Sequence, residues 1–296
     1  MEMVAASKMK RAVSAVLAIR PYAHSAWSVL GNLGRAFENY EMTLIEAREV
    51  RKILIIFISS NRGLCGGFNS QLARKVIEQA KNPGKLKINR VGDRRIESSV
   101  PDGDIEIDFI TVGKKGASAV RKAGKNIIAT FDDLAYIPKS EDVRPLARLA
   151  MDDYAAKKYD KVVVAFTDYV SAVVQQPKFR QILPISRVDI EKQLADIDML
   201  ADEVGLVEPP MEYKVEPDVK IVLTEILPRL VEMQLYHAIL ESNASKESAR
   251  MVAMRNATDA AEDMVSNLTL IFNQMRQAGI TQEIAEISAG RAALES

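Results

Sequence analysis

The chain has 296 residues, and its 40 Lys and Arg residues balance its 40 Asp and Glu residues, which excludes a global basic field that would recruit nucleic acid or an anionic membrane. Aromatic residues make up only 6% of the chain, so its apolar surface is mostly aliphatic, a composition that favours closely packed helices. Cys65 is the single cysteine, which excludes an internal disulfide, and the longest apolar run, 53–58, is far shorter than the roughly 20 residues of a membrane-spanning helix.

The N-terminal part of the chain has a helical composition. Residues 1–20 are rich in alanine and contain neither glycine nor proline. Helical character resumes over residues 22–50, with weak points at Gly31 and Gly34. We therefore expect an N-terminal coiled-coil helix within residues 1–51, and no secretory signal peptide, because a cleavable apolar core is lacking.

The middle of the chain, residues 52–195, has the pattern of a compact α/β domain. Short apolar or alternating runs predict strands at 52–59, 105–112 and 161–167. Helices are expected between them, at 70–80 and from Ser140 to about Lys158. Because strands alternate with helices, we expect a Rossmann-like α/β fold with a mostly parallel sheet.

The C-terminal part, residues 218–296, follows an acidic, proline-containing connector at 196–217. Pro228 is the last proline, and no glycine occurs from there until Gly279. Most positions taken in alternating steps of four and three from Ile226 are apolar, which is the repeat of a coiled coil. A helix of about 70 residues would be on the order of 100 Å long, so it is expected to project from the globular domain.

A projecting helix with an apolar stripe needs a partner, and the N-terminal helix is the obvious one. The two ends of the chain would then form a long antiparallel coiled coil, with the α/β domain as its foot. This shape indicates a lever, a spacer or a shaft.

The glycine-rich loop at 62–69 follows a predicted strand and precedes a predicted helix, as phosphate-binding loops do. Its glycines do not match G-x-G-x-x-G, and no Gly-Lys-Ser/Thr follows, so they are better explained by a tight turn. Cys65 lacks a nearby base, because the only histidines, His24 and His237, lie on the helical arms. The acidic pairs at 132–133 and 152–153 lack metal-ligand spacing. We therefore expect no catalytic residue, no metal site and no cofactor.

Stretches at the start, middle and end of the chain together resemble the gamma subunit of F-type ATP synthase. They are MEMVAASKM at 1–9, SSNRGLCGGFN at 59–69, the block at 240–290 and the tail ITQEIAEISAGRAA at 280–293. GKKG at 113–116 and YKVEPD at 213–218 also fit, so the resemblance covers essentially the whole chain. One departure is that family members usually begin some twenty residues earlier, with a basic stretch. The dithiol insert of the chloroplast form is also missing.

The resemblance implies a non-catalytic central rotor stalk. The coiled coil would sit inside a hexamer of alternating alpha and beta subunits, and the foot would rest on the membrane ring of c subunits and bind the epsilon subunit. Ion-driven rotation of the ring would then drive the catalytic sites through their conformations. The chain is expected on the cytoplasmic face of an energy-transducing membrane, a bacterial inner membrane, held there only through its partners.

The resemblance also implies contact residues. Arg276, Gln277 and Thr281 match family positions that hydrogen-bond loops of the catalytic subunits at the upper shaft. Tyr213 and Glu216 match the foot segment that touches the c ring and the epsilon subunit.

A second set of contacts is implied nearer the foot. Lys8, Lys10 and Arg11 lie where the family's N-terminal helix meets an acidic arm of the beta subunit, although such a basic cluster is more often only a solvated face. Arg62 and Cys65 fall in a loop near that same arm.

Two other functions remain open. The chain could be a nucleotide-binding α/β enzyme whose helices serve as oligomerisation arms, or a coiled-coil scaffold unrelated to energy conversion. The scaffold explains the rod but leaves the glycine-rich loop and the C-terminal tail as coincidences.

Overall fold

A computed structural model of the chain describes residues 1–19, 21, 25, 42–91, 94–171, 174–186, 216 and 218–294. The chain divides into two compact units, Met1–Met251 and Val252–Ser296. The predicted contact residue Tyr213 and the connector at 196–215 lie outside the described residues, as does most of 20–41.

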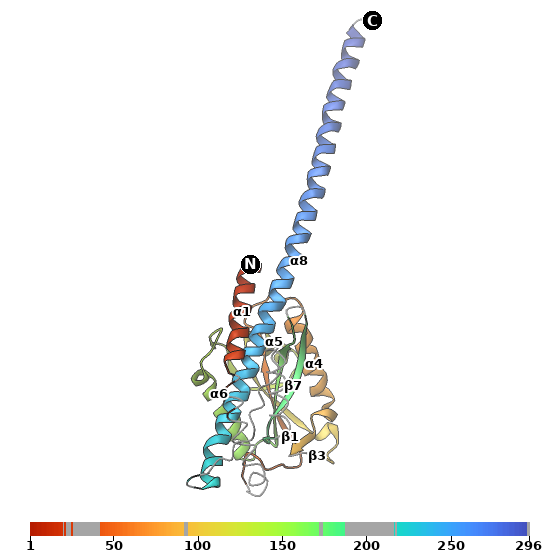
Figure 1. Cartoon of the computed structure of the whole chain (residues 1–296). Coiled ribbons are helices and arrows are strands. Elements are labelled where there is room, and N and C mark those ends of the chain that lie inside the picture. The colour runs from red at the N-terminus through yellow and green to blue at the C-terminus, as the bar shows by residue number, and fades with distance from the viewer. Residues whose placement is uncertain are drawn as a thin grey trace. The chain divides into compact units, whose positions relative to one another are not determined.

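The N-terminal unit contains a β-sheet, of which β1 and β7 are labelled in Figure 1. This sheet has five strands in the order β5-β4-β1-β6-β7. Its strands are β1 (Lys52–Ile58), β4 (Glu106–Val112), β5 (Asn126–Phe131), β6 (Lys161–Tyr169) and β7 (Gln175–Leu183). The first four are parallel, and β7 pairs antiparallel with β6. The predicted α/β fold with a mostly parallel sheet is thus confirmed, and the three predicted strands correspond to β1, β4 and β6.

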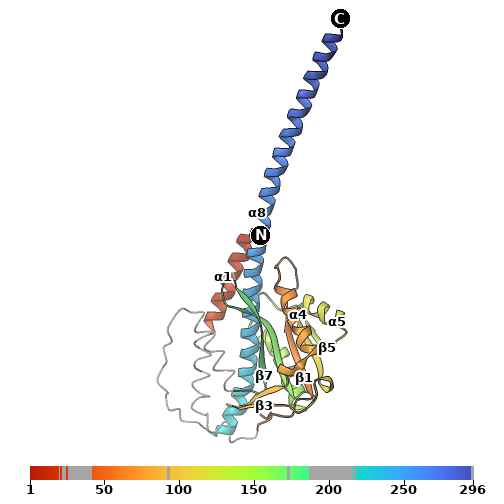
Figure 2. The same ribbon diagram turned by 90° about the vertical axis from the view of Figure 1, so that its right-hand side faces the viewer.

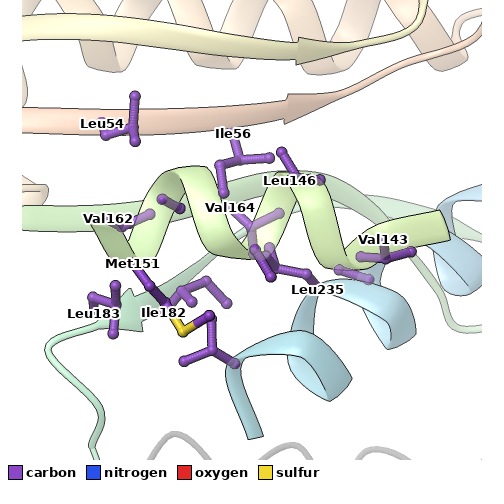
Figure 3. Packing of buried hydrophobic residues seen from close by; sticks show 14 of the residues in the cluster. Leu54, Ile56, Val143, Leu146, Met151, Val162, Val164, Ile182, Leu183 and Leu235 are labelled. Atoms are coloured by element: carbon purple, nitrogen blue, oxygen red, sulfur yellow. The ribbon is translucent and has the colours of Figure 1, made fainter. Parts of the chain in front are cut away.

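Helices cover both faces of this sheet because side chains alternate along each parallel strand. On one face, Ile53, Ile55 and Phe57 of β1 pack with α4 (Phe68–Lys81) and α5 (Lys114–Lys122). On the other face, the strands pack with α6 (Ser140–Ala155) and α8 (Val219–Leu294). Figure 3 shows strand residues Leu54, Ile56, Val162 and Val164 together with Val143 and Leu146 of α6 and Leu235 of α8. The core therefore has two layers, one on each side of the sheet.

The remaining short elements are a two-stranded antiparallel ribbon and two 3₁₀ turns. The ribbon is formed by β2 (Ile88–Val91) and β3 (Arg94–Glu97). The turns are η1 (Pro83–Lys85) and η2 (Asp102–Asp104).

Helix α6 (Ser140–Ala155) confirms the helix expected from Ser140, with a different cap. The backbone N–H of Lys139 donates to the carboxylate of Asp142 at 2.8 Å, so the capping carboxylate comes from inside the first turn. Ser140 is the first helical residue and not the cap.

The two terminal helices pack together within the N-terminal unit. Helix α1 (Glu2–Ala18) lies beside α8 (Val219–Leu294) and runs in the opposite direction, as Figures 1 and 2 both show. The 17 residues of α1 correspond to about 26 Å and the 76 residues of α8 to about 114 Å, so α1 can cover only a fraction of α8. The expected antiparallel pairing of the ends is confirmed, but the described helix ends at Ala18.

The backbone at 42–51 is not helical, which differs from the helix expected up to residue 51. Three side chains from elsewhere in the unit donate hydrogen bonds to carbonyls of this segment, Tyr154 Oη to Glu46 O, Asn89 Nδ2 to Arg48 O and Ser98 Oγ to Val50 O. These tertiary hydrogen bonds outweigh the local helical propensity.

The C-terminal unit consists of the end of α8. Every side chain described between 255 and 291 is exposed. The exposed residues include ten large apolar ones, Met264, Val265, Leu268, Leu270, Ile271, Phe272, Met275, Ile280, Ile284 and Ile287. This stretch includes much of the coiled-coil seam predicted from the sequence.

Candidate functional site: the collar network

The loop at 59–67 connects β1 to α4, the place at which doubly wound α/β proteins often hold a phosphate. Here the side-chain amide of Asn69 forms hydrogen bonds with two residues of the loop. Its amide Nδ2 donates to Ser60 Oγ at 2.8 Å and to Cys65 Sγ at 3.1 Å, and its Oδ1 accepts the Ser60 N–H at 3.2 Å. Gly66 has a φ of +52°, which agrees with the expected tight strand-to-helix turn.

Tyr136, in the loop between β5 and α6, joins the two terminal helices. Its hydroxyl donates to the backbone carbonyl of Lys8 on α1 at 2.9 Å. Its own carbonyl accepts from Asn243 Nδ2 on α8 at 2.8 Å. The ammonium groups of Lys8 and Lys246 lie 5.6 Å and 5.1 Å from the centre of its ring, so both cations interact with the same aromatic ring.

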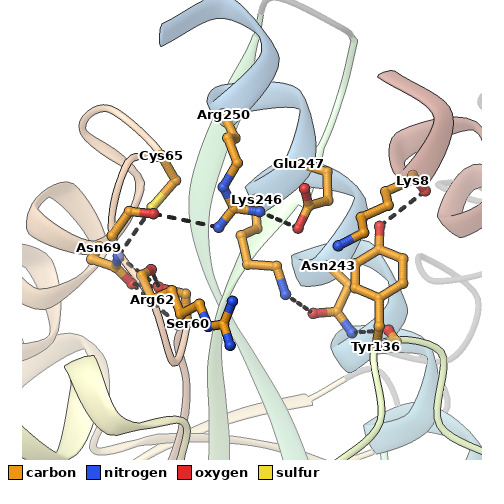
Figure 4. A network of polar contacts seen from close by, with 11 residues as sticks. Lys8, Ser60, Arg62, Cys65, Asn69, Tyr136, Asn243, Lys246, Glu247 and Arg250 are labelled. Carbon is orange, nitrogen blue, oxygen red and sulfur yellow. Dashed lines mark hydrogen bonds and ion pairs between the residues drawn. The ribbon is translucent and has the colours of Figure 1, made fainter. Parts of the chain in front are cut away.

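The contacts on α8 come from one side of the helix. Lys246 Nζ donates to Asn243 Oδ1 at 2.7 Å, and the buried Glu247 forms an ion pair with Arg250. Arg250 Nη2 reaches the carbonyl of Gly63 in the β1–α4 loop at 3.5 Å. We call the set formed by Lys8, Tyr136, Asn243, Lys246, Glu247, Arg250 and loop 59–67 the collar network (Figure 4).

The electrostatics of the collar network are unusual at Lys246. Burial, with the positive charges of Arg250 and Lys8, lowers the pKa of its ammonium to about 8, while Glu247 and Cys65 oppose the shift. Burial also raises the pKa of the Tyr136 hydroxyl, which therefore stays protonated as a hydrogen-bond donor.

A second polar cluster lies deeper, between α8 and the β6–β7 hairpin. Glu241 is fully buried, with Arg180 Nη2 of β7 at 3.8 Å and His237 Nδ1 at 3.2 Å from its Oε2. Asp168 forms an ion pair with Lys178 at 3.0 Å nearby. The sequence places His237 on the helical seam as a packed residue, and it is indeed buried.

Several residues singled out in the sequence lie around the collar network. Lys8, Lys10 and Arg11 are exposed on α1, and Arg62 is exposed in the β1–α4 loop. Cys65 in the same loop is buried and free, with the Asn69 amide as its partner.

The other predicted contact residues lie elsewhere. Arg276, Gln277 and Thr281 are exposed on α8 in the C-terminal unit, where the Thr281 hydroxyl donates to the Gln277 carbonyl at 2.9 Å. Glu216 is exposed just before α8.

Sequence reasoning missed Tyr136, Asn243, Lys246, Glu247 and Arg250. The last four recur at positions i, i+3, i+4 and i+7, a spacing that places them on one side of a helix. A polar side on an otherwise apolar stretch of helix is the sequence pattern that could have identified these four residues. Nothing near Tyr136 in the sequence points to α1 or α8.

No metal-binding arrangement of three or more His, Cys, Asp or Glu side chains occurs in the described parts of the chain. Among the same residues, no helix combines the length and the apolar character needed to span a membrane.

Comparison with known proteins gives consistent results. The family model described as "ATP synthase" matches residues 1–294. The chain is 38% identical over 299 residues to the ATP synthase gamma chain of Dehalococcoides mccartyi strain CBDB1, covering 99% of this chain and 92% of that one. It is 33% identical over 297 residues to the ATP synthase gamma chain of Legionella pneumophila strain Corby, with the same two coverages.

Solved structures show a similar fold. A chain in the central stalk and c-ring structure of the Tetrahymena thermophila mitochondrial ATP synthase aligns with a TM-score of 0.58 at 23% identity, covering 87% of this chain and 97% of that one. A chain of the Euglena gracilis mitochondrial ATP synthase aligns with a TM-score of 0.54 at 17% identity, covering 99% and 94%.

Proposed function

This chain belongs to the ATP synthase gamma chain family, and we propose that it turns as the rotor shaft inside a hexamer of alternating alpha and beta subunits. As a gamma chain it is a non-catalytic component of the central stalk of ATP synthase. Its proposed role is to couple ion-driven rotation of the membrane c ring to the conformational cycle of the catalytic sites.

The observation that supports this role most directly is the exposed apolar surface at the end of α8. Large side chains such as Leu268, Phe272 and Met275 are exposed on a helix that no other described segment covers over 255–291. Exposed apolar surface of this extent marks a site of interaction. A ring of subunits around the helix would cover it from all sides.

The proposed mechanism needs no chemistry in this chain. Each orientation of the shaft would favour one conformation of each catalytic subunit, since a conformational equilibrium shifts only through differential interaction with its states. Moving such an equilibrium from 1:99 to 99:1 takes about 5.5 kcal/mol. Apolar contact along α8, together with a few charged contacts, could supply free energies of this size.

For the charged contacts we propose the residues identified from the family resemblance. Arg276, Gln277 and Thr281 would hydrogen-bond catalytic-subunit loops near the end of α8. Arg276 suits this role because its planar guanidinium can engage a carboxylate through two hydrogen bonds.

The collar region would meet an acidic arm of the beta subunit through Lys8, Lys10, Arg11 and the loop that carries Arg62 and Cys65. Because Cys65 is buried, its thiol would position the loop while the exposed Arg62 makes the contact.

Tyr213 and Glu216 would contact the c ring and the epsilon subunit. Residues 52–195 would then serve as the foot, 196–217 as its connecting segment, and residues 1–51 and 218–296 as the shaft. These contacts would hold the chain at the cytoplasmic face of a bacterial inner membrane.

The test is co-expression with matching alpha and beta subunits, purification through a tag on beta, and assay of stoichiometry and ATP hydrolysis. The proposal expects a single copy of this chain per hexamer and hydrolysis faster than that of the ring alone. Failure to co-purify, even after an upstream basic extension is added, would contradict it. Heat on calorimetric titration of the isolated chain with ATP would favour a nucleotide-binding enzyme instead.

A further inference from the structure

Lys246 is a partly buried cation without a carboxylate of its own. Its only hydrogen-bond acceptor within the described parts of the chain is Asn243 Oδ1, although an ammonium carries three donors. Glu247, the neighbouring carboxylate, forms an ion pair with Arg250. Burying a charge that is not fully paired costs free energy, and this cost is specific to the protonated form of the amine.

The groups around Lys246 come from every segment of the collar network. Lys8 of α1 faces the same Tyr136 ring, and Arg250 of α8 adds a second positive charge. Glu247 and Cys65 oppose them. Burial and the two cations outweigh these opposing groups, so the ammonium loses its proton more readily here than it does in water.

We propose that the collar network is a proton-linked latch, whose closed state, with Lys246 packed against Tyr136 and Asn243, is favoured by loss of the proton from the amine, and whose open state, with Lys246 in solvent, is favoured by its uptake. The latch connects α1 to α8, because Tyr136 contacts Lys8 through its hydroxyl and Asn243 through its carbonyl. Opening removes Lys246 from Asn243 and from the ring, and so loosens the attachment of α1. This device lies within the chain and does not depend on the rotor role.

Linkage fixes the direction and the pH window of the effect. The pKa of Lys246 is about 8 in the closed collar network and returns toward the ordinary 10.5 on opening. The open state therefore binds more protons between these values, and its population falls as the pH rises through them. Between pH 7.5 and 9.5 the open population is expected to fall about 20-fold.

Limited proteolysis of the isolated full chain measures this opening. Trypsin cleaves after Lys8, Lys10 and Arg11 of α1, and mass spectrometry quantifies these cuts. The rate at each pH is divided by that of a synthetic peptide of residues 1–19 in the same tube, which removes the pH dependence of trypsin itself. The wild-type ratio is expected to fall about 20-fold from pH 7.5 to 9.5.

Three variants make the test specific. Lys246→Met keeps the collar network closed and gives slow cleavage at both pH values, whereas Lys246→Arg stays charged and gives fast cleavage at both. Lys158→Met is the matched control, since Lys158 also lies over a tyrosine ring, at 5.3 Å, but is paired with Asp153. It should keep the wild-type fall. An unchanged wild-type ratio, or a Lys246→Met variant that keeps the fall, would overturn the latch.

A second measurement applies even if a Lys246 variant fails to fold. The rate at which acetic anhydride acetylates Lys246 in the wild-type chain, followed by mass spectrometry, should titrate near pH 8. In Tyr136→Ala, which removes the ring that covers the amine, the titration should move above pH 10. A titration above pH 10 in both proteins would refute the proposal.

Discussion

The carboxylate of Glu241 on α8 lies 3.8 Å from the guanidinium of Arg180 on β7, and both side chains are buried. This pair joins the C-terminal helix to β7, an edge strand of the sheet, through two buried side chains. Its importance lies less in the attraction it supplies than in the cost of leaving either charge alone in the core.

Replacement of Glu241 by Gln should therefore be strongly destabilising. We expect the free energy of unfolding at pH 7, measured by urea denaturation, to fall by about 3 to 5 kcal/mol. Glu232→Gln is the matched control, because Glu232 pairs with the partly exposed Arg144 and should cost less than about 1 kcal/mol. Equal losses in the two variants would contradict the role assigned to the buried pair.

The Glu241→Gln substitution should cost less unfolding free energy in acid than at pH 7. Burial raises the pKa of Glu241, but His237 and Arg180 outweigh burial and hold the pKa at about 2, below the ordinary 4.5. A depressed carboxyl pKa contributes stability that is present above pH 4.5 and is lost as the pH falls toward 2. The difference in unfolding free energy between wild type and Glu241→Gln should shrink over this range.

Gly113 illustrates a position that only glycine can occupy. It lies between β4 and α5 with a φ of +93°, and a Cβ added there would stand 2.6 Å from the carbonyl oxygen of Ser59. Gly113→Ala should lower the free energy of unfolding by about 2 to 4 kcal/mol, because backbone strain and a clash with a fixed strand end add together.

Two other glycines separate these contributions. Gly124 has a φ of +67° but open space around it, so Gly124→Ala should cost only about 1 to 2 kcal/mol. Gly103 has neither feature, and Gly103→Ala should change stability by less than about 0.5 kcal/mol. Equal losses of unfolding free energy in the Gly113 and Gly124 variants would mean that the close contact with Ser59 adds nothing to the cost.

Asn69 should control access to the only thiol. Without its amide, Ser60 and Cys65 lose their shared partner and the β1–α4 loop can open. We expect Asn69→Ala to raise the rate of Cys65 modification by a maleimide about tenfold, the equivalent of one lost hydrogen bond of about 1.4 kcal/mol. Ser70→Ala, which removes only a bond to the Gly67 carbonyl, should leave the rate unchanged.

Arg276 tests the proposed contact at the end of α8. In the assembled complex, Arg276→Ala should lower ATP-driven ion pumping about tenfold, because a charge-assisted hydrogen bond contributes roughly 1.5 to 3 kcal/mol. Assembly and folding should be normal, because the side chain is exposed in the isolated chain. Gln274→Ala, an exposed neighbour on the same helix, is the control. Normal pumping by the Arg276 variant would count against the contact.

The predictable parts of the fold are those in which a local pattern and the tertiary structure agree. Strands β1, β4 and β6 are interior strands of the sheet and are read directly as apolar or alternating runs. The edge strands β5 and β7 were not predicted, since β5 is only half-buried and β7 is largely polar and contains Pro177. Proline is tolerated in β7 because an edge strand has one unpaired side.

The collar network could not be predicted because its contacts join residues far apart in the chain. Tyr136 is 128 residues from Lys8 and 107 from Asn243. No window of sequence contains both partners of such a bond. A single sequence can place a residue on one side of a helix, but only the folded chain decides what faces it.

The inclusion of α8 in the core has a consequence for how the protein is made. The core layer that contains α6 also needs Leu223, Leu227 and Leu235 of α8. On a ribosome these residues emerge after every strand of the sheet has been synthesised. A nascent chain that stops short of α8 therefore presents a wide apolar face. Chaperones and proteases bind such exposed apolar surfaces, so we expect a chain that lacks α8 to be retained or degraded before it can assemble with other subunits.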